Sequence, residues 1–227
     1  MHEGGIDRPS GQQAAESRQN GWRFGLKCLF DRSIAAAALG LSAPVMGLVA
    51  AGIWATMGRP ILFVQERPGR GGRPFWLIKF RTMRLDGAAL GPRADGERLT
   101  RYGRFLRSLS LDELPQLFNV LKGDMSLVGP RPLLMQYLER YTPEQARRHD
   151  VMPGMTGWAQ VNGRNDTTWE DRLRLDVEYV DTWSLALDAR ILLMTISRVL
   201  QRSGVSNTAS ATMPEFFGSA TATPPAP

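Results

Sequence analysis

An uncharged run of 25 residues, from Ser33 to Met57, constrains this chain more than any other feature. As a straight helix with a rise of about 1.5 Å per residue, it would be about 37 Å long. The hydrocarbon core of a bilayer is only about 30 Å thick. Pro44 stands near the middle of the run, where a proline removes a backbone hydrogen bond and kinks a helix. The run therefore predicts a membrane helix that is broken at Pro44.

Basic residues flank this run on both sides. Three precede it, and seven follow it: Arg23, Lys27 and Arg32, then Arg59, Arg67, Arg70, Arg73, Lys79, Arg81 and Arg84. A helix that crosses the membrane once should carry its basic excess on one side only. Basic flanks on both sides favour a re-entrant helix, whose two ends both stay in the cytoplasm. A kinked single span and a buried helix of a soluble protein are the alternatives.

The whole chain divides into four predicted regions. Residues 1–20 are polar and predict a disordered tail, and residues 21–58 predict an interfacial and re-entrant membrane helix. Residues 59–203 would form the catalytic globular domain. Residues 204–227 are rich in Ser, Thr, Ala and Pro and predict a second disordered tail.

The globular region predicts an α+β fold that is mostly helical. Turn formers between two apolar runs predict a short β-hairpin over Ile61–Met83. Apolar residues at helical spacing, or clusters of turn formers, predict the other elements. These are a loop over Arg84–Glu97, helices over Leu99–Leu109 and Leu114–Leu121, a helix over Pro132–Arg148 interrupted near Pro143, a site-forming loop over Met152–Asn165, and helices over Trp169–Trp183 and Leu185–Leu200.

The net charge of +6 and the pI of about 10.1 favour an anionic partner. That partner could be a nucleic acid, an anionic membrane surface or a phosphorylated substrate. Cys28 is the only cysteine, which excludes an intrachain disulfide and a Cys-rich zinc site. Because the chain has only two histidines, His2 and His149, any metal is expected to be a hard cation held by carboxylates.

Asp112 and Glu113 form an adjacent acid pair within an apolar stretch. One interpretation is structural, because Ser110 and Glu113 have the spacing of a capping box and Pro115 suits a first helical turn. The other is chemical, because two neighbouring carboxylates can share Mg²⁺ with a diphosphate. An aspartate that cations keep ionised can also act as a nucleophile.

Five cations in neighbouring segments could neutralise a phosphate group rather than form a solvated basic surface. They are Lys79, Arg81, Arg107, Arg131 and Arg164. Arg131 favours a site most clearly, because Pro130 and Pro132 restrict the backbone on both sides of it.

Four long motifs in this order resemble the monotopic phosphoglycosyl transferases, the bacterial sugar transferase family that begins membrane-linked glycan assembly. They are Lys79–Met83 (Lys-Phe-Arg-Thr-Met), Arg107–Gln116 (Arg-Ser-Leu-Ser-Leu-Asp-Glu-Leu-Pro-Gln), Gly123–Pro132 (Gly-Asp-Met-Ser-Leu-Val-Gly-Pro-Arg-Pro) and Pro153–Asn165. The resemblance covers roughly residues 22 to 203, and several ordered motifs are more specific than any short match.

The resemblance implies a reaction: transfer of a sugar-1-phosphate from a UDP-sugar to polyprenyl (undecaprenyl) phosphate, the first membrane step of glycan or exopolysaccharide assembly. Asp112 would be the nucleophile, forming an aspartyl phosphosugar, and Glu113 would hold Mg²⁺ or assist the acceptor. Arg107 and Arg131 would neutralise phosphate charge, and Lys79 and Arg164 match other basic positions. Further candidates in the matching segments are Asp176, Gln160 and Asn162.

The resemblance also implies a place in the cell, the bacterial inner membrane with the globular part on its cytoplasmic face. Membrane lipid would be a partner and nucleic acid would not, while a homodimer is an open alternative. One departure concerns the kink: the family commonly has Ser directly before the proline, whereas Ala43 stands there and Ser42 lies one position earlier. The kink is therefore expected to depend more on Pro44 alone.

Two other functions fit the same residues. A nucleic-acid-binding protein would explain the high pI, although carboxylates among the cations would repel a phosphate backbone unless a metal intervenes. A membrane-associated interaction module without chemistry would explain the membrane helix and would leave the acid pair only a capping role.

Overall fold

The computed structural model describes residues 19, 21–85, 95–163, 167–200 and 215–219. Over these ranges the fold is mostly helical with two small two-stranded sheets, which confirms the predicted mixture of helices and a hairpin. All of the predicted N-terminal tail except Gln19, most of the predicted C-terminal tail and most of the predicted loop over 84–97 lie outside the described residues.

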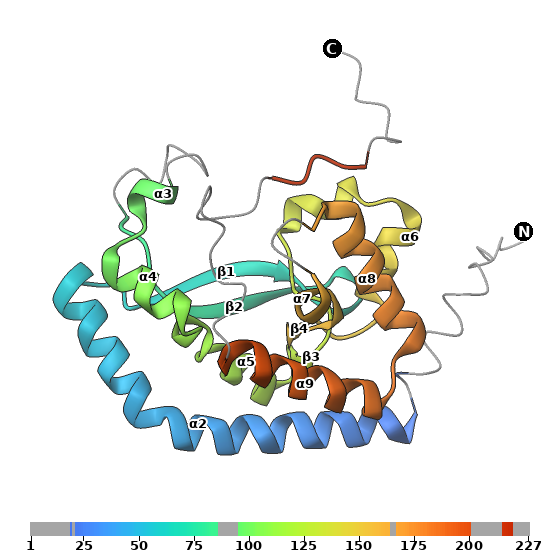
Figure 1. Ribbon diagram of the computed structural model, residues 1–227, viewed down its shortest axis with the longest axis horizontal. Helices are drawn as coiled ribbons and strands as arrows, with labels where there is room; N and C mark the ends of the chain where they lie inside the picture. Colours follow the sequence, from blue (N-terminus) through green and yellow to red (C-terminus); the bar gives the residue numbers. More distant parts are fainter. Residues whose placement is uncertain (1–18, 20, 86–94, 164–166, 201–214, 220–227) are drawn as a thin grey trace, which may run out of the picture.

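The predicted membrane helix is helix α2, Trp22–Met57, which is continuous over 36 residues. It runs along one side of the globular part and bends near its middle, and Pro44 lies inside it (Figure 1). The predicted break is thus a bend within one helix. Ser42 Oγ donates a hydrogen bond to the carbonyl of Ala38 at 2.6 Å, whereas Pro44 deprives the carbonyl of Gly40 of its helical donor. The Ser42 hydroxyl therefore bonds a carbonyl other than the one that Pro44 leaves without a helical donor.

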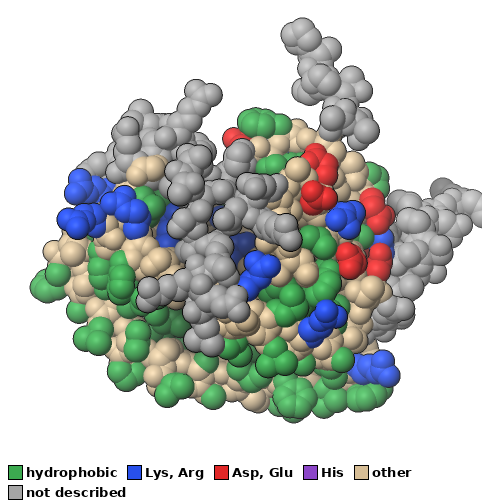
Figure 2. Space-filling model, in the orientation of Figure 1, with side chains coloured by type: hydrophobic (Ala, Val, Ile, Leu, Met, Phe, Trp, Pro, Cys, Tyr) green, Lys and Arg blue, Asp and Glu red, His purple; other side chains and the backbone are tan. Residues whose placement is uncertain are grey.

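Most apolar side chains of α2 face away from the globular part. Only 11% of its most apolar 18-residue window is buried inside the protein, and Leu41 is 86% exposed. Figure 2 shows hydrophobic side chains along the lower edge of the molecule, where Figure 1 places α2. By length and composition α2 could cross a membrane. Its exposed apolar surface contradicts the alternative of a buried soluble helix and favours membrane association.

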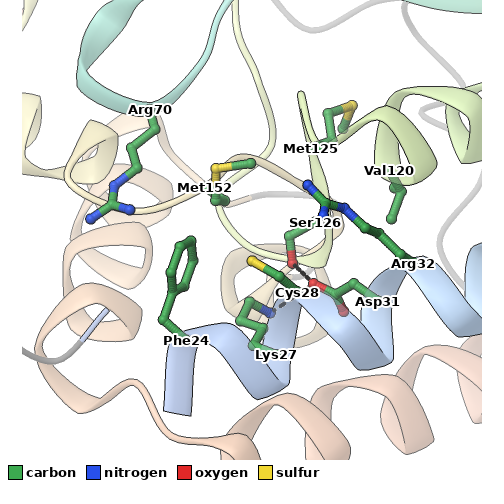
Figure 3. Close-up of a pocket in the computed structure, with 11 residues that line it drawn as sticks. Phe24, Lys27, Cys28, Asp31, Arg32, Arg70, Val120, Met125, Ser126 and Met152 are labelled. Atoms are coloured by element: carbon green, nitrogen blue, oxygen red, sulfur yellow. Dashed lines mark hydrogen bonds and ion pairs between the residues drawn. The ribbon is translucent and has the colours of Figure 1, made fainter. Parts of the chain in front are cut away.

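A buried ion pair fastens the start of α2 to helix α9, Leu185–Leu200. Lys27 Nζ lies 2.6 Å from Asp188 Oδ2, and the Lys27 side chain is 2% exposed. One turn later, Asp31 accepts a hydrogen bond from Ser126 Oγ at 2.6 Å (Figure 3). Removing a charged group from water costs several kcal/mol, which a close partner of opposite charge can offset. These contacts therefore fix the position of the start of α2 relative to the globular part.

Arg81 fastens the other end of α2. Its Nη2 donates to the carbonyls of Met57 at 2.6 Å and Gly58 at 2.7 Å, and its Nη1 to that of Arg59 at 3.3 Å. These carbonyls lie at the helix C-terminus, where the last turn leaves acceptors unsatisfied and a cation is favourable. Both ends of α2 therefore contact the same globular part.

The predicted hairpin is confirmed. Strand β1, Leu62–Pro68, pairs antiparallel with strand β2, Pro74–Phe80, and Leu62 lies opposite Phe80. A short 3-10 turn η1, Arg70–Gly72, joins them. The register places Lys79 on β2 one residue before the end of the strand, opposite Phe63.

A second sheet was not expected from the sequence. Strand β3, Ser126–Val128, pairs in parallel with strand β4, Gly154–Thr156. The segment predicted as a site-forming loop over Met152–Asn165 thus contains β4 and a short helix α7, Trp158–Asn162. Strands of three residues are too short to show a periodic pattern, and the glycines around them resemble a loop.

The predicted interrupted helix over Pro132–Arg148 is wrong. That segment forms three short pieces, the 3-10 helix η5 (Met135–Arg140), helix α6 (Pro143–Ala146) and the 3-10 helix η6 (Arg147–His149). Thr142 begins α6 with a complete capping box, in which its side chain accepts from the backbone of Gln145. Local caps divide the chain here more finely than its apolar spacing suggests.

Four further helices agree with the predictions within a few residues: α4 (Arg101–Ser108), α5 (Gln116–Lys122), α8 (Trp169–Thr182) and α9. Two short elements were not predicted. They are helix α3 (Asp95–Arg98), at the end of the predicted loop over Arg84–Glu97, and the 3-10 turn η4 (Leu111–Glu113) before α5. The main core joins apolar side chains of α5, β3, α8 and α9 with Ala35 of α2. In a second cluster, Leu111 of η4 packs with Ile53 of α2 and Phe80 of β2, which holds η4 close to the hairpin and to the second half of α2.

Replacing Asp188 by asparagine should destabilise the protein by about 3 kcal/mol, because it removes the closer of the two carboxylates that pair with the buried Lys27 and leaves only Asp31, at 3.5 Å. The measurement is chemical unfolding in detergent, followed by circular dichroism. Arg174→Ala is the matched control, since Arg174 and its partner Asp171 are 66% and 52% exposed. Such an exposed pair should contribute about 0–1 kcal/mol. Equal losses in both variants would contradict the buried anchor.

Candidate functional site

The acid pair lies on η4 beside strand β2. Lys79 Nζ donates to Glu113 Oε1 at 2.9 Å, and Arg131 Nη2 donates to the same oxygen at 2.5 Å. Lys79 comes from β2 and Arg131 from the loop after β3, so three segments far apart in sequence meet at one carboxylate. The structure thereby brings together four of the predicted site residues, counting Asp112 next to Glu113.

Asn119 holds the acid pair against the hairpin, and sequence reasoning missed it. Its side-chain oxygen accepts from the backbone N–H of Ile78 at 3.1 Å, and its Nδ2 donates to the carbonyl of Trp76 at 2.7 Å. Asn119 is 2% exposed and belongs to α5, which follows η4 directly. The available signal was a lone amide in the apolar run Leu117–Leu121.

A second buried contact positions the backbone of Arg131. Arg148 Nη2 donates to the carbonyl of Arg131 at 2.8 Å, and Arg148 Nε and Nη2 donate to Asp176 Oδ2 at 3.0 Å and 2.7 Å. Arg148 and Asp176 are 2% and 3% exposed. Asp176 therefore does not join the acid pair; it acts through Arg148, which the sequence prediction did not include.

Close packing of glycines fixes the same loop. A Cβ on Gly129 would lie 2.1 Å from the carbonyl oxygen of Met152, and one on Gly154 would lie 2.1 Å from the backbone nitrogen of Gly129. No side chain fits at such distances, which explains glycine at both positions. The loop that carries Arg131 is thus fixed in two ways: its backbone packs closely at the glycines, and the Arg131 guanidinium binds Glu113.

Asp112 is buried, with 8% of its surface exposed. Among the residues that the structure describes, no hydrogen bond or ion pair engages its carboxylate. Burial and the negative charge of Glu113 raise the pKa of Asp112, while Lys79, Arg107 and Arg131 oppose that shift. A partly desolvated carboxylate without a direct partner is more reactive than one held in an ion pair.

Glu113 is in the opposite electrostatic state. Burial alone would raise its pKa, but the charges of Arg131 and Lys79 lower it from 4.5 to about 2. Burial and the charge of Arg131 in turn lower the pKa of Lys79. The two neighbouring acids are therefore distinct: Glu113 is neutralised by direct contacts, and Asp112 is influenced by the same cations only at a distance.

The capping interpretation of the acid pair is wrong. Ser110 adopts the left-handed conformation, with φ of 54°, and its side chain makes no capping bond. The acids lie in the separate turn η4, and the N-cap of α5 is Pro115. A non-glycine residue at positive φ is strained, and such strain collects at functional sites.

Two predicted cations lie in different places. Arg107 Nε donates to Thr82 Oγ1 at 3.1 Å, and its charge influences Asp112. Arg81, in contrast, donates to the carbonyls at the end of α2 and is 5% exposed. The structure therefore brings Arg107 toward the acid pair and gives Arg81 a contact with the membrane helix.

The remaining candidates do not join the acid pair. Gln160 Nε2 donates to the carbonyl of Met155 at 3.0 Å, and Asn162 Nδ2 donates to that of Trp158 at 2.9 Å. These bonds stay within the β4–α7 segment. Arg164 lies outside the described residues.

Two further arginines near Arg131 were not chosen from the sequence as site residues. Burial and the charge of Arg131 lower the pKa of Arg67, on β1, to about 10. Burial also lowers the pKa of Arg172, on α8, with Arg131 and Arg148 contributing to the same direction. Cations that repel one another across a shared space create a field that favours an anionic ligand. The positions of Arg67 and Arg172 in the sequence do not indicate that both lie near Arg131 in the fold.

The donor set of the acid pair fits a hard cation such as Mg²⁺. Among the described residues, no group of three or more His, Cys, Asp or Glu could hold a metal ion. Mg²⁺ commonly takes only one or two carboxylates and completes its shell with substrate phosphates and water. Asp112, which has no direct partner, and the second oxygen of Glu113 provide that number of carboxylates.

A cavity of about 210 Å³ lies elsewhere, beside the start of α2 (Figure 3). Lys27, Arg32 and Arg70 contribute basic side chains to its wall, together with Asp31 and Ser126. None of the predicted site residues lines it. The acid pair and this cavity are therefore separate features of the described surface.

Comparison with known proteins agrees with this geometry. Residues 22–202 match the family model described as bacterial sugar transferase. The chain belongs to the bacterial sugar transferase family. The resemblance that its motifs carry is thereby confirmed, and with it the enzyme class, a phosphoglycosyl transferase.

Several curated relatives of this transferase have informative names. The "Uncharacterized sugar transferase EpsL" of Bacillus subtilis is 51% identical over 195 residues, which cover 86% of this chain and 96% of that protein. The "UDP-glucose:undecaprenyl-phosphate glucose-1-phosphate transferase" of Xanthomonas campestris is 42% identical over 88% of this chain but only 42% of that protein. A protein of the same name in Caulobacter vibrioides is 44% identical, over 77% of this chain and 69% of that protein.

Replacing Glu113 by glutamine should lower the stability of this transferase at pH 7 by about 3 kcal/mol, as the shift of its pKa from 4.5 to about 2 requires. The folded pKa is depressed, so this stability is present above pH 4.5 and is lost as the pH falls toward 2. Wild type and variant should therefore converge at acidic pH in unfolding curves measured in detergent.

Glu144→Gln is the matched control, because Glu144 pairs with Arg147 on the surface and is 66% exposed. That change should cost about 0–1 kcal/mol. A difference between wild type and Glu113→Gln that persists unchanged to pH 2 would contradict the assigned ion pairs.

Proposed function

We propose that this transferase moves a sugar-1-phosphate from a UDP-sugar to polyprenyl phosphate, with Asp112 as the covalent nucleophile. The observation that carries the proposal is the unequal acid pair. Glu113 is engaged by Lys79 and Arg131, whereas Asp112 is buried with no hydrogen bond or ion pair among the described residues. The names of the Xanthomonas and Caulobacter relatives support the same donor and acceptor classes.

The reaction would proceed in two displacements. In the first, an oxygen of the Asp112 carboxylate attacks the β-phosphorus of the UDP-sugar. The bond between that phosphorus and the oxygen bridging to the α-phosphate breaks, and UMP leaves with the bonding electrons. In the second, a phosphate oxygen of the polyprenyl phosphate attacks the same phosphorus. The aspartyl bond breaks, the carboxylate is restored, and polyprenyl-diphospho-sugar is released.

Cations around the acid pair would stabilise the charge that develops on the transferred group. Arg131 and Lys79 already contact Glu113, and Arg107 lies close enough to influence Asp112. A planar guanidinium held by its own backbone contacts is preorganised for phosphate oxygens. When bound, Mg²⁺ would be held by Asp112 and Glu113 and would neutralise the diphosphate and its leaving group.

The membrane helix would place this site at the level of the lipid headgroups. We infer that α2 is re-entrant, with both ends on the cytoplasmic side of the inner membrane. The contact of Lys27 with Asp188 near one end and of Arg81 with Met57 at the other supports this, because both bind the same globular part. A helix that crossed the bilayer would carry its two ends to opposite sides.

Asp112→Asn should reduce UMP release from a UDP-sugar by at least about a thousandfold, as loss of a covalent nucleophile does. Its stability should stay equal or rise, because burial raises the pKa of Asp112 and so disfavours its charged form. Intact-mass spectrometry of the wild type with a UDP-sugar panel should show one added phosphosugar, which the variant lacks.

Asp171→Asn serves as the control, since Asp171 is an exposed carboxylate on α8 and should retain activity within about twofold. Full activity in Asp112→Asn would overturn the covalent mechanism. UMP release that the panel never shows with the wild type, in the presence of Mg²⁺ and polyprenyl phosphate, would overturn the reaction itself.

The re-entrant arrangement predicts that both ends of α2 react with a membrane-impermeant thiol reagent from the same side. Gly21→Cys and Arg59→Cys, each in a Cys28→Ser background, place single thiols at exposed positions before and after the helix. Both should be labelled in inverted inner-membrane vesicles and protected in intact spheroplasts. Labelling of the two positions from opposite sides would establish a single span instead.

A further inference from the structure

A short C-terminal segment, residues 215–219, packs against the globular part. It lies beyond residue 202, where the family match ends, and Figure 1 draws it in red near α6. Phe216 is 1% exposed, whereas its neighbour Phe217 is 79% exposed. Two adjacent phenylalanines therefore have opposite environments, which indicates that the segment docks with a defined face.

Phe216 inserts among three aromatic rings. Its ring centroid lies 5.7 Å from that of Tyr137, 5.7 Å from that of Tyr141 and 5.4 Å from that of Trp169. Its backbone N–H donates to Tyr137 Oη at 3.2 Å. We call Tyr137, Tyr141 and Trp169 the aromatic pocket. Aromatic contacts of this kind stabilise beyond the area that they bury.

Polar contacts on either side of Phe216 fix the register of the segment. Glu215 Oε1 accepts from Gln136 Nε2 at 2.8 Å and from Arg140 Nη1 at 2.9 Å. Ser219 Oγ accepts from Gln145 Nε2 at 2.6 Å. Arg140 also donates to the carbonyl of Phe216. Nonspecific collapse of an apolar tail would not satisfy side chains and backbone at successive positions in this way.

The aromatic pocket is connected to the candidate site through one arginine. The guanidinium of Arg148 lies 5.7 Å from the ring centroid of Tyr141, on which Phe216 stacks with an interplanar angle of 28°. The same guanidinium donates to the carbonyl of Arg131, whose own side chain contacts Glu113. Tyr141 thus contacts both the docked segment and the arginine that holds Arg131.

We propose that the aromatic pocket is a docking site for this chain's own C-terminal segment, and that docked Phe216 is a positioning residue for Arg131. Phe216 confines Tyr141, Tyr141 confines Arg148, and Arg148 fixes the backbone of Arg131 beside the acid pair. The docking stands on the contacts alone. Its effect on turnover rests on the proposed function, in which Arg131 stabilises the transferred phosphate.

Hydrogen–deuterium exchange of the full-length chain in detergent tests the docking without any substrate. In Phe216→Ala, the amides of residues 215–219 and of 135–141 should exchange at least about tenfold faster than in wild type, because their local opening costs less. Phe217→Ala removes the same side chain from the exposed neighbour. It loses only the contact of that ring with the guanidinium of Arg140, 5.5 Å from the ring centroid, and should speed exchange by less than about fivefold. Equal exchange in the two variants would overturn the docking.

Turnover tests the positioning. Well below the melting temperature of each variant, Phe216→Ala should lower kcat for UMP release about tenfold with a smaller change in KM, since a displaced cation acts mainly on the transition state. Phe216→Leu should recover part of kcat, and Phe217→Ala should stay within about twofold of wild type. Equal kcat in Phe216→Ala and Phe217→Ala would overturn the positioning role. Absence of UMP release from wild type would overturn the proposed reaction, while the exchange comparison would still decide the docking.

Discussion

The carboxylate of Glu113 is the contact on which the candidate site depends. One of its oxygens accepts from Lys79 on the hairpin and from Arg131 in the loop after β3, so a single acid joins three segments. Two cations so close together would repel each other without it. By occupying both cations, Glu113 also leaves Asp112 without a direct partner among the described residues. The ion pairs of Glu113 and the absence of a direct partner for Asp112 among the described residues are thus two consequences of one arrangement.

A few contacts likewise hold the two ends of α2 against the globular part. Lys27 and Arg81 bind near its two ends, and Pro44 supplies the bend that lets both ends meet one globular body. Arg81 stands two positions after Lys79, so the end of β2 serves the helix terminus and the acid pair together. The hairpin therefore fixes the position of the acid pair relative to the end of α2.

Much of this was readable from the sequence, because it depends on local patterns. The uncharged run predicted α2, turn formers between two apolar runs predicted the hairpin, and adjacent acids among arginines predicted which residues meet. Contacts that depend on three-dimensional packing were not readable: the amide bonds of Asn119, the role of Arg148 behind Arg131, and the β3–β4 pairing through Gly129 and Gly154. Arg81 looked like a phosphate ligand because residue type and spacing do not reveal which acceptor a guanidinium reaches.

The electrostatics of the site explain how one environment can hold two acids in different states. Burial by itself raises the pKa of both carboxyls. At Glu113 the ion pairs lower the pKa by more than burial raises it, whereas Asp112 makes no direct ion pair among the described residues. Burial raises the pKa of the Asp112 carboxyl, while the cations around it favour its ionised form, which is the form that can act as a nucleophile. Arg67 and Arg172 add positive charge that no carboxylate of the acid pair neutralises by direct contact. In the proposed reaction, the diphosphate of the donor would neutralise this positive charge. The same cations would then both bind the substrate and stabilise the transferred phosphate.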